Sequence, residues 1–328
     1  MKKINWGIIG TGRIAHTFAQ ALVGCENAIP AAVASRTLEK AENFASEFGF
    51  PKAYGSYEEL ARDSSIDAVY IATPMSSHFK DTMLCLENGK NVLCEKSVSL
   101  NSAELEKMLS LAKEKGLFFM EAMWMKCKPT FLKVMNWINC GNIGTVRYIK
   151  ADFCNFVPYN GDDRLFRAEC GGGALLDLGV YPITLAASIM GNEPDEIISF
   201  AHIDRGGIDL SNSVTLRYKE GFASINSGFE IANNNNAVIS GDNGSIVIGD
   251  WFLCSCEAVL YDRNGAELER SVLPNEINGY EYEIKEFCRC LNEGLTESPL
   301  VPHSVTLAVM RIMDKCRRDW GMKFPQEL

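Results

Sequence analysis

The 328-residue chain lacks the features that mark zinc proteins, disulfide-stabilised proteins and nucleic-acid-binding proteins. It has four histidines, far apart in the sequence, and none of its twelve cysteines forms a C-x-x-C pair, so no metal site is expected. The scattered cysteines indicate reduced, mostly buried thiols in a cytoplasmic protein. The net charge is −10 and no basic stripe offsets it, which argues against nucleic acid as a partner.

The chain is also poor in long apolar runs, and none is expected to reach the length of a membrane span. Met1-Lys2-Lys3 resembles the start of a signal peptide, but the apolar run after it breaks at Gly10 and contains Arg13. A membrane partner is therefore not expected. Hydrophobic residues make up 47% and charged residues 23%, an ordinary globular composition that suggests about two domains at this length.

The most informative stretch is a glycine-containing turn near the N-terminus. A short apolar run, predicted as a strand, ends at Gly10-Thr11-Gly12-Arg13-Ile14-Ala15. In this G-x-G-x-x-A pattern the glycines let the backbone approach a diphosphate, and the helix that follows supplies free N–H groups. The pattern alone also fits a tight turn that binds no ligand.

A second apolar segment, residues 28–34, strengthens the interpretation because it ends where a dinucleotide fold places the residue that reads the ribose. An NAD site usually presents a carboxylate there, whereas this chain has Ser35 and Arg36, with Lys40 one helical turn later. A guanidinium can bind a 2′-phosphate, so NADP is favoured. NAD stays possible, because Glu39 is nearby and the two cations could be solvated.

The first part of the chain alternates predicted strands and helices. Strands are predicted at 28–34, 53–54, 66–72, 91–94 and 117–120, and helices at 37–48, 57–62, 78–88 and 102–115. Apolar strands separated by helices indicate a parallel sheet covered on both faces, with ligands at the carboxyl ends of its strands.

From about residue 145 the pattern changes to successive strands. Strands are predicted at 146–155, 197–203, 213–218, 222–229, 236–240, 245–248 and 258–262, and helices within 171–190 and at 281–292 and 303–320. Lys219-Glu220-Gly221 and Asp242-Asn243-Gly244 are typical of hairpin turns. The second part is therefore predicted to contain an antiparallel sheet.

Lys96 is the first candidate catalytic residue, because it follows an apolar strand and should project toward a bound nicotinamide. An amine there can donate a proton or lower the pKa of a neighbouring acid while hydride moves. The alternative is an ion pair between Lys96 and Glu95 or another acid.

Asp177 and Tyr181 are the second candidates. They lie four residues apart in an otherwise apolar segment, a spacing that puts both on one face of a helix. The pKa of a free tyrosine is about 10, so a nearby lysine cation would be needed near neutrality. The alternative is a buried tyrosine whose hydroxyl is satisfied by Asp177. His78, in the first turn of a helix after Thr73-Pro74, could bind the ribose or cap the turn.

Taken together, these motifs resemble the Gfo/Idh/MocA oxidoreductases. The matching segments are Gly10 to Ala15, Ala72-Thr73-Pro74 with His78, Glu95-Lys96, Glu121-Ala122-Met123-Trp124 and Gly171 to Tyr181. They occur in the family's order over nearly the whole chain. The most similar branch contains dimeric dihydrodiol dehydrogenase, NADP-dependent D-xylose dehydrogenase and glucose–fructose oxidoreductase.

The resemblance implies an α/β Rossmann domain over residues 1–122 and, over 123–328, an α+β domain with an open, mainly antiparallel sheet whose exposed face commonly makes a homodimer. It implies that Lys96 and Tyr181 carry proton transfer and that Asp177 orients the substrate or tunes Tyr181. The expected cofactor-binding residues are Gly10, Thr11, Gly12, Arg13, Ile14, Ser35, Arg36, Lys40, Thr73, Pro74, His78, Glu95 and Lys96. One departure is Ser97, which stands where the family has proline after the lysine. The change puts the local peptide geometry in question.

The sequence thus predicts an NADP(H)-dependent oxidoreductase that moves hydride between the nicotinamide and a secondary alcohol or carbonyl of a sugar, polyol or dihydrodiol. Two alternatives on the same fold are an NAD-dependent glycoside hydrolase and a non-catalytic dinucleotide-binding regulator. The substrate depends on side chains of the open sheet and on loops such as 153–167.

Overall fold

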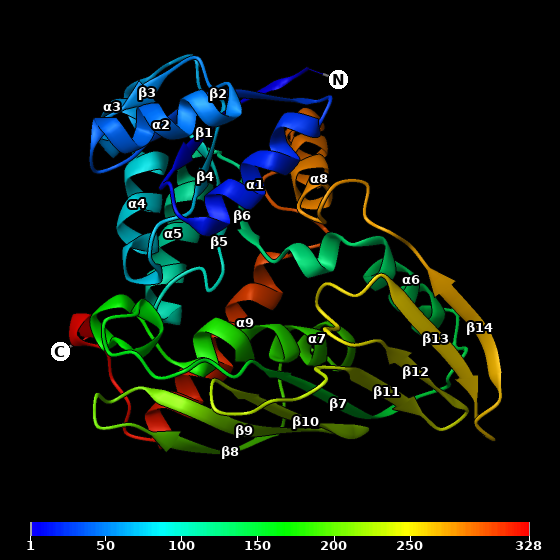
Figure 1. Cartoon of the computed structure of the whole chain (residues 1–328). Coiled ribbons are helices and arrows are strands. Elements are labelled where there is room, and N and C mark those ends of the chain that lie inside the picture. Colours follow the sequence, from blue (N-terminus) through cyan, green and yellow to red (C-terminus); the bar gives the residue numbers. More distant parts are fainter. Residues whose placement is uncertain (1, 328) are drawn as a thin grey trace. The chain divides into compact units, whose positions relative to one another are not determined.

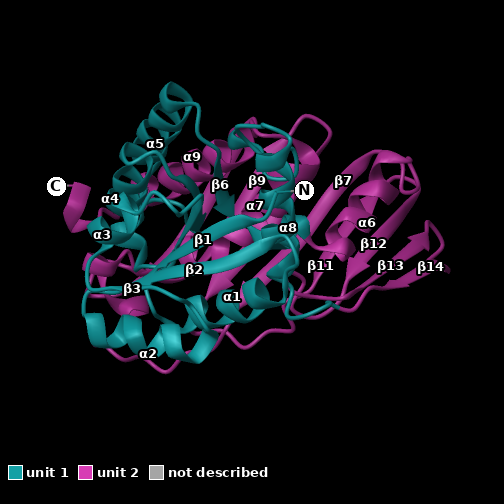
Figure 2. Ribbon diagram, turned by 90° about the horizontal axis from the view of Figure 1, so that it is seen from above, with its two compact units in different colours: residues 1–127, 275–303 teal, residues 128–274, 304–328 magenta. Residues whose placement is uncertain are grey.

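The computed structural model describes residues 2–327. The chain forms two compact units (Figure 2): unit 1 comprises residues 1–127 and 275–303, and unit 2 comprises residues 128–274 and 304–328. The sequence analysis placed one boundary after residue 122 and kept everything beyond it together. In the structure, residues 275–303 return to the first unit.

Unit 1 is built on a six-stranded parallel sheet with the strand order β3-β2-β1-β4-β5-β6. The strands are β1 (Ile4–Ile9), β2 (Ala28–Ala34), β3 (Ala53–Tyr54), β4 (Ala68–Ile71), β5 (Asn91–Glu95) and β6 (Phe119–Ala122). The order reverses between β1 and β4, which is where sheets of this type bind ligands, beyond the carboxyl ends of the strands. The predicted parallel sheet is confirmed.

The strands of unit 1 alternate with helices (Figure 1). The helices are α1 (Arg13–Gly24), α2 (Leu38–Phe48), α3 (Tyr57–Arg62), α4 (Met75–Glu87), α5 (Ser102–Lys115) and α8 (Glu281–Asn292), with a 3₁₀ turn, η1 (Trp124–Cys127). Their ends follow local chemistry: Asn101 caps α5 by accepting the Glu104 N–H at 2.9 Å, and Gly116 ends that helix in the left-handed conformation.

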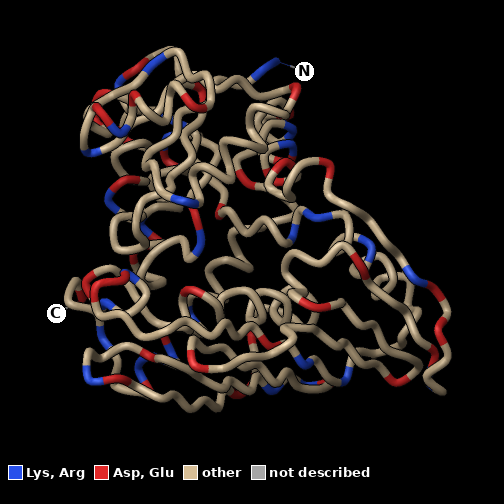
Figure 3. Tube along the Cα trace, viewed as in Figure 1, with Lys and Arg blue, Asp and Glu red and all other residues tan. Residues whose placement is uncertain are grey.

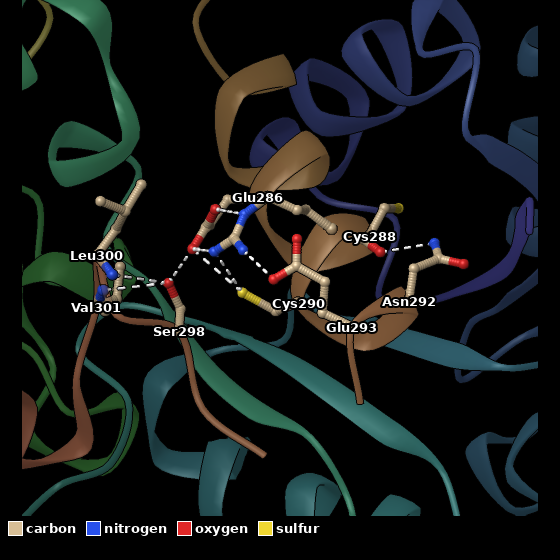
Figure 4. A network of polar contacts seen from close by, with 9 residues as sticks. Glu286, Cys288, Cys290, Asn292, Glu293, Ser298, Leu300 and Val301 are labelled. Carbon is tan, nitrogen blue, oxygen red and sulfur yellow. Dashed lines mark hydrogen bonds and ion pairs between the residues drawn. The ribbon is translucent and has the colours of Figure 1, made fainter. Parts of the chain in front are cut away.

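Helix α8 is fixed to the segment that follows it by a buried polar network (Figure 4). The Glu286 carboxylate accepts from both Arg289 and the Ser298 hydroxyl. The same serine oxygen accepts the N–H groups of Leu300 and Val301. On its other side α8 packs Phe287 against Trp6 of β1, with ring centroids 4.6 Å apart. These contacts explain why residues 275–303 belong to unit 1.

Unit 2 contains an eight-stranded open sheet with the order β14-β13-β12-β11-β7-β10-β9-β8. The strands are β7 (Val146–Cys154), β8 (Glu196–Ile203), β9 (Asp209–Tyr218), β10 (Gly221–Gly228), β11 (Ala237–Gly241), β12 (Gly244–Ile248), β13 (Glu257–Asp262) and β14 (Glu267–Val272). Every neighbouring pair is antiparallel except β7 and β10. The predicted mainly antiparallel sheet is confirmed, and both predicted hairpin turns join paired strands.

The helices of unit 2 cover one face of this sheet (Figure 1). They are α6 (Pro129–Asn139), α7 (Val180–Met190) and α9 (His303–Asp319), together with the short turns η2 (Arg164–Phe166), η3 (Ala168–Cys170), η4 (Leu175–Gly179) and η5 (Pro325–Glu327). In β8, exposed residues alternate strictly with half-buried ones, as expected for a strand with one solvent-facing side. The sequence analysis did not predict α6 or β14.

Among the described residues, the helical segment Ala168–Met190 is the one that is long and apolar enough to cross a membrane by length and composition. The expectation that no stretch reaches that length was therefore wrong. The segment's mean hydropathy reaches 1.5, but 78% of that window is buried inside the structure. Core helices have the same property, since they are apolar on all sides.

All twelve cysteines are free, and most are buried, as the sequence suggested. Burial raises the pKa of several of these thiols, for example that of Cys25 to about 11. Acidic and basic residues are intermingled along the trace in each unit (Figure 3). The surplus of negative charge is thus spread over many elements.

Candidate functional site

The glycine turn has the geometry that a bound diphosphate needs. Gly10 follows β1 and has φ of +100°, and a Cβ there would lie 2.6 Å from the carbonyl oxygen of Ala72. Gly12 precedes α1, makes no side-chain cap, and has open space where a Cβ would stand. The first N–H groups of α1 are therefore left for an anion. Thr11, Arg13 and Ile14 complete this turn.

At the end of β2 the structure places a cationic, carboxylate-free position. Ser35 is buried, and its hydroxyl lies 3.3 Å from that of Thr11 in the glycine turn. Arg36 and Lys40 are exposed, and within residues 2–327 neither pairs with a carboxylate. The donor set therefore fits a dinucleotide, and the two cations suit an additional phosphate on the ribose.

Glu95, the last residue of β5, and Lys96, which follows it, differ in their surroundings. Glu95 is 6% exposed; its carboxylate accepts the Tyr70 hydroxyl and, at 3.1 Å, the Lys96 backbone N–H. Lys96 follows directly and is half-buried. The peptide bond between Lys96 and Ser97 is cis.

His78 joins two of the loops at this edge of the sheet. Its Nδ1 lies 2.8 Å from the carbonyl oxygen of Ser97, and its Nε2 lies 2.9 Å from that of Thr73. The hydroxyl of Thr73 in turn donates to Asp81, at 2.8 Å. Pro74, between these residues, is exposed and precedes α4. The imidazole thus connects the loop after β4 with the turn that contains Lys96.

One buried group near Glu95, Glu283, had no signal in the sequence. Glu283 on α8 is fully buried, and neither of its carboxylate oxygens has a hydrogen-bond partner among the described residues. Burial, together with the nearby Glu95, raises the pKa of Glu283 well above its usual value. Trp124, which follows β6, stacks on Tyr280 with ring centroids 4.7 Å apart. A glutamate in a helix is normally interpreted as a surface residue, so periodicity could not reveal this one.

Asp177 and Tyr181 lie in one continuous helical segment of unit 2. Asp177 is within η4, which is a π-helical turn, and Tyr181 is the second residue of α7. Tyr181 is 4% exposed and packs edge-on against Phe153, with ring centroids 5.6 Å apart. Asp177 lies 3.5 Å from the guanidinium of Arg164, an ion pair that the sequence analysis missed.

The three glycines before this segment allow close backbone approach. A Cβ on Gly172 would lie 2.6 Å from the carbonyl oxygen of Leu165. Gly173 has φ of +122°, and a Cβ there would collide with a carboxylate oxygen of Asp209. Larger residues at either position would displace the chain just ahead of Asp177.

Within residues 2–327 no group of three or more His, Cys, Asp or Glu side chains is arranged to hold a metal ion. The polar groups at the glycine turn and at the end of β2 fit a dinucleotide. With the parallel sheet and its glycine turn, they define a nicotinamide-dependent oxidoreductase.

Comparison with known proteins agrees with this class. Residues 4–123 match the model of the oxidoreductase family with an NAD-binding Rossmann fold, and residues 131–247 match the GFO/IDH/MocA C-terminal domain. The chain belongs to the Gfo/Idh/MocA family. The family recognised from the sequence is thereby confirmed, and so is the assignment as a dehydrogenase or reductase.

Among the relatives are trans-1,2-dihydrobenzene-1,2-diol dehydrogenases. The proteins from Xenopus laevis and Homo sapiens are each 34% identical to this chain; the matches cover 98% and 99% of this chain, respectively, and 99% of each relative. A similar solved structure is KijD10, a 3-ketoreductase from Actinomadura kijaniata in complex with NADP and TDP-benzene. Its TM-score is 0.87 at 26% identity, with 97% of this chain and 98% of that chain covered. The glycoside hydrolase and regulator alternatives are not favoured by these relatives.

Proposed function

We propose that the protein is an NADP(H)-dependent oxidoreductase that interconverts a secondary alcohol and a carbonyl on a dihydrodiol, sugar or polyol. The observation that carries the cofactor choice is the end of β2, where Ser35, Arg36 and Lys40 offer a hydroxyl and two cations that pair with no carboxylate among the described residues. The substrate class is supported by the relatives, which are named as dihydrodiol dehydrogenases, and by the 3-ketoreductase solved with NADP.

The proposal gives each polar residue a task. When bound, the nicotinamide supplies or accepts the hydride. Tyr181 exchanges a proton with the substrate oxygen, and Lys96 lowers the pKa of that phenol by its positive charge and polarises the same oxygen. Asp177, held by Arg164, orients the substrate or tunes Tyr181.

The cofactor contacts follow from the same geometry. The turn from Gly10 to Ile14 takes the diphosphate, and Ser35, Arg36 and Lys40 take the ribose and its phosphate. Thr73, Pro74 and Glu95 shape the loops at the ends of β4 and β5. His78 acts on the cofactor site by holding the carbonyl groups of Thr73 and Ser97 in place.

The test is a substrate panel with NADP⁺ and NAD⁺, followed at the nicotinamide absorbance. The panel contains trans-1,2-dihydrobenzene-1,2-diol, D-xylose and further aldoses and polyols. Turnover should appear with at least one of them and be faster with NADP⁺. Lys96→Ala and Tyr181→Phe should each bind NADPH as the parent does and lose turnover by roughly a hundredfold or more. Full turnover in either variant would contradict the assigned role.

We further propose that the sheet of unit 2 makes a homodimer through its solvent-facing side. That side exposes Ile198, Phe200 and Phe222, which are 49%, 72% and 47% exposed, and Tyr148 packs beside Phe222. Large apolar side chains clustered on one face are typical of an interface. Light scattering should give twice the chain mass, and Phe200→Glu should shift it to the monomer. A parent protein that is monomeric at micromolar concentration would refute this.

The cytoplasm is the compartment we propose, because twelve free thiols suit a reducing environment. Fractionation of cells that express the protein, with blots of each fraction, checks it.

A further inference from the structure

A buried carboxyl group lies directly beneath the segment that contains Asp177 and Tyr181. Asp209 opens β9 and is fully buried. Its Oδ2 accepts the backbone N–H of Leu175 at 2.8 Å and the side-chain amide of Asn212 at 2.8 Å. Within residues 2–327 its Oδ1 has no hydrogen-bond partner, and it faces Gly173.

The polar contacts continue from Asp209 to the other end of η4. The Ser227 hydroxyl donates to the Asn212 side-chain oxygen at 2.9 Å. The same hydroxyl packs against Gly179, where a Cβ would lie 2.9 Å from it. The chain Asp209–Asn212–Ser227 therefore holds the first residue of η4 by a hydrogen bond and its last residue by close packing. Asp177 lies between these two points, and Tyr181 follows two residues after the second.

We propose that Asp209 is a positioning residue for the reaction: by binding the Leu175 N–H it fixes the π-helical turn that presents Asp177 and Tyr181. The inference rests on the proposed roles of those two residues. A hydrogen bond from an N–H to a carboxylate is stronger than one to a neutral acceptor, so the ionised form holds the turn best. Small displacements of groups that exchange protons cost large factors in rate, because the reacting atoms must be aligned.

The electrostatic surroundings of Asp209 place its ionisation near neutrality. Burial raises the pKa of Asp209 to about 7, although Asn212, the Leu175 N–H and the charge of Arg317 all act in the opposite direction. Arg317 lies on α9, and Cys316 of the same helix also interacts electrostatically with Asp209. The hydrogen-bond donors to Asp209 from η4 and β9, the Leu175 N–H and the Asn212 amide, are uncharged. The turn is therefore held more firmly above neutral pH than below it.

The experiment compares three variants with the parent, using the substrate that gives turnover in the panel above. Asp209→Ala removes the acceptor, and Asp209→Asn keeps an acceptor oxygen but cannot ionise. Asp204→Asn is the matched control, because Asp204 accepts a backbone N–H in the connection before β9, not in η4. For each protein, kcat and KM for NADP⁺ are measured from pH 6 to 9, together with amide exchange of the peptide that contains Leu175.

Asp209→Ala should lose roughly tenfold to a hundredfold in kcat, with KM for NADP⁺ within about twofold of the parent and faster exchange at Leu175. Asp209→Asn should recover most of the rate but lose the ionisation near neutrality, and Asp204→Asn should match the parent. If Asp209→Ala does not fold, the pH profile and the exchange rate of Asp209→Asn decide whether Asp209 has the positioning role.

Tyr181→Phe, measured in parallel, distinguishes a failure of the positioning role of Asp209 from a failure of the proposed function. Should Tyr181→Phe lose turnover while both Asp209 variants keep the parental kcat, pH profile and exchange rate, the positioning role is wrong and the proposed function stands. Should Tyr181→Phe keep full turnover, the proposed function itself fails. Faster exchange at Leu175 in Asp209→Ala would then still demonstrate the structural contact.

Discussion

At the scale of single residues, the surroundings of a buried carboxyl group decide whether its pKa is lowered or raised. Asp63, after α3, accepts from Lys52, from Tyr54 and from both the N–H and the hydroxyl of Ser65. Burial alone would raise the pKa of Asp63, but these donors outweigh it and hold the pKa far below the usual value. Glu283 has burial without donors, and its pKa moves upward.

The Asp63 donors predict a dependence of stability on pH. Because the folded state lowers the pKa of Asp63, its contribution is present above the pKa of the unfolded chain, near 4, and is lost as the pH falls toward the folded value. We expect Asp63→Asn to lower the free energy of unfolding by about 2 kcal/mol at pH 7. Urea denaturation at pH 7 and at pH 4 measures this.

The loss should shrink at pH 4, where the parent begins to lose the same interaction. Glu42→Gln, on the exposed side of α2, removes the same charge without these contacts and should be neutral. An equal loss at both pH values would show that the ionised carboxyl does not supply the stability.

At the scale of elements, sequence patterns predicted well those strands, helices and turns that depend on residues close together in the chain. The alternation of apolar segments gave the parallel sheet of unit 1, and turn residues such as Asp242-Asn243-Gly244 gave hairpins of unit 2. The strand β14 was missed because its side chains are mostly charged and exposed at the edge of the sheet, which leaves no alternation. The spacing of Asp177 and Tyr181 indicated a helix, but could not reveal that its first turn is a π-turn.

Pairings between distant segments could not be predicted in the same way. The parallel pairing of β7 with β10 and the contact of Asp209 with Leu175 depend on residues far apart in sequence. A lone aspartate at the start of a strand has no local signature. By contrast, the glycine turn and the residues after β2 and β5 could be proposed as site residues from the sequence, because such sites lie at strand ends.

The network around α8 provides a test at this scale. Ser298→Ala removes a hydroxyl that donates to Glu286 and accepts two backbone N–H groups. Since these groups are buried, we expect a loss of about 1–3 kcal/mol in the free energy of unfolding, measured by urea denaturation. Ser110→Ala, at an exposed position of α5, should change it by less than about 0.5 kcal/mol. Equal effects of the two substitutions would rule out a specific contribution of the network.

At the scale of the whole molecule, cofactor preference and proton transfer are proposed to depend on different residues. The cofactor preference should therefore be alterable without changing the residues that transfer protons. The residues proposed to read the ribose lie in unit 1, as does Lys96, whereas Asp177 and Tyr181 lie in unit 2. A change at the end of β2 should then affect the cofactor preference and leave the folding of unit 2 intact.

Arg36→Asp tests this. The new carboxylate would repel a 2′-phosphate and could accept hydrogen bonds from the ribose hydroxyls of NAD. We expect kcat/KM with NADP⁺ to fall by roughly a hundredfold while that with NAD⁺ is unchanged or rises. Steady-state kinetics with both cofactors measure it, and Arg205→Asp, an exposed position of unit 2, controls for net charge. Equal losses with both cofactors would exclude a role in phosphate recognition.

The return of residues 275–303 to unit 1 also bears on how the chain matures during synthesis. Phe287 of α8 packs on Trp6 and on Phe118, so these two rings lack this part of their cover until α8 has left the ribosome. By then the whole sheet of unit 2 has been translated. During synthesis, residues 1–127 therefore expose part of this aromatic surface until α8 has been translated. Chaperones that bind exposed apolar surface would have their greatest effect on the yield of folded protein at this stage.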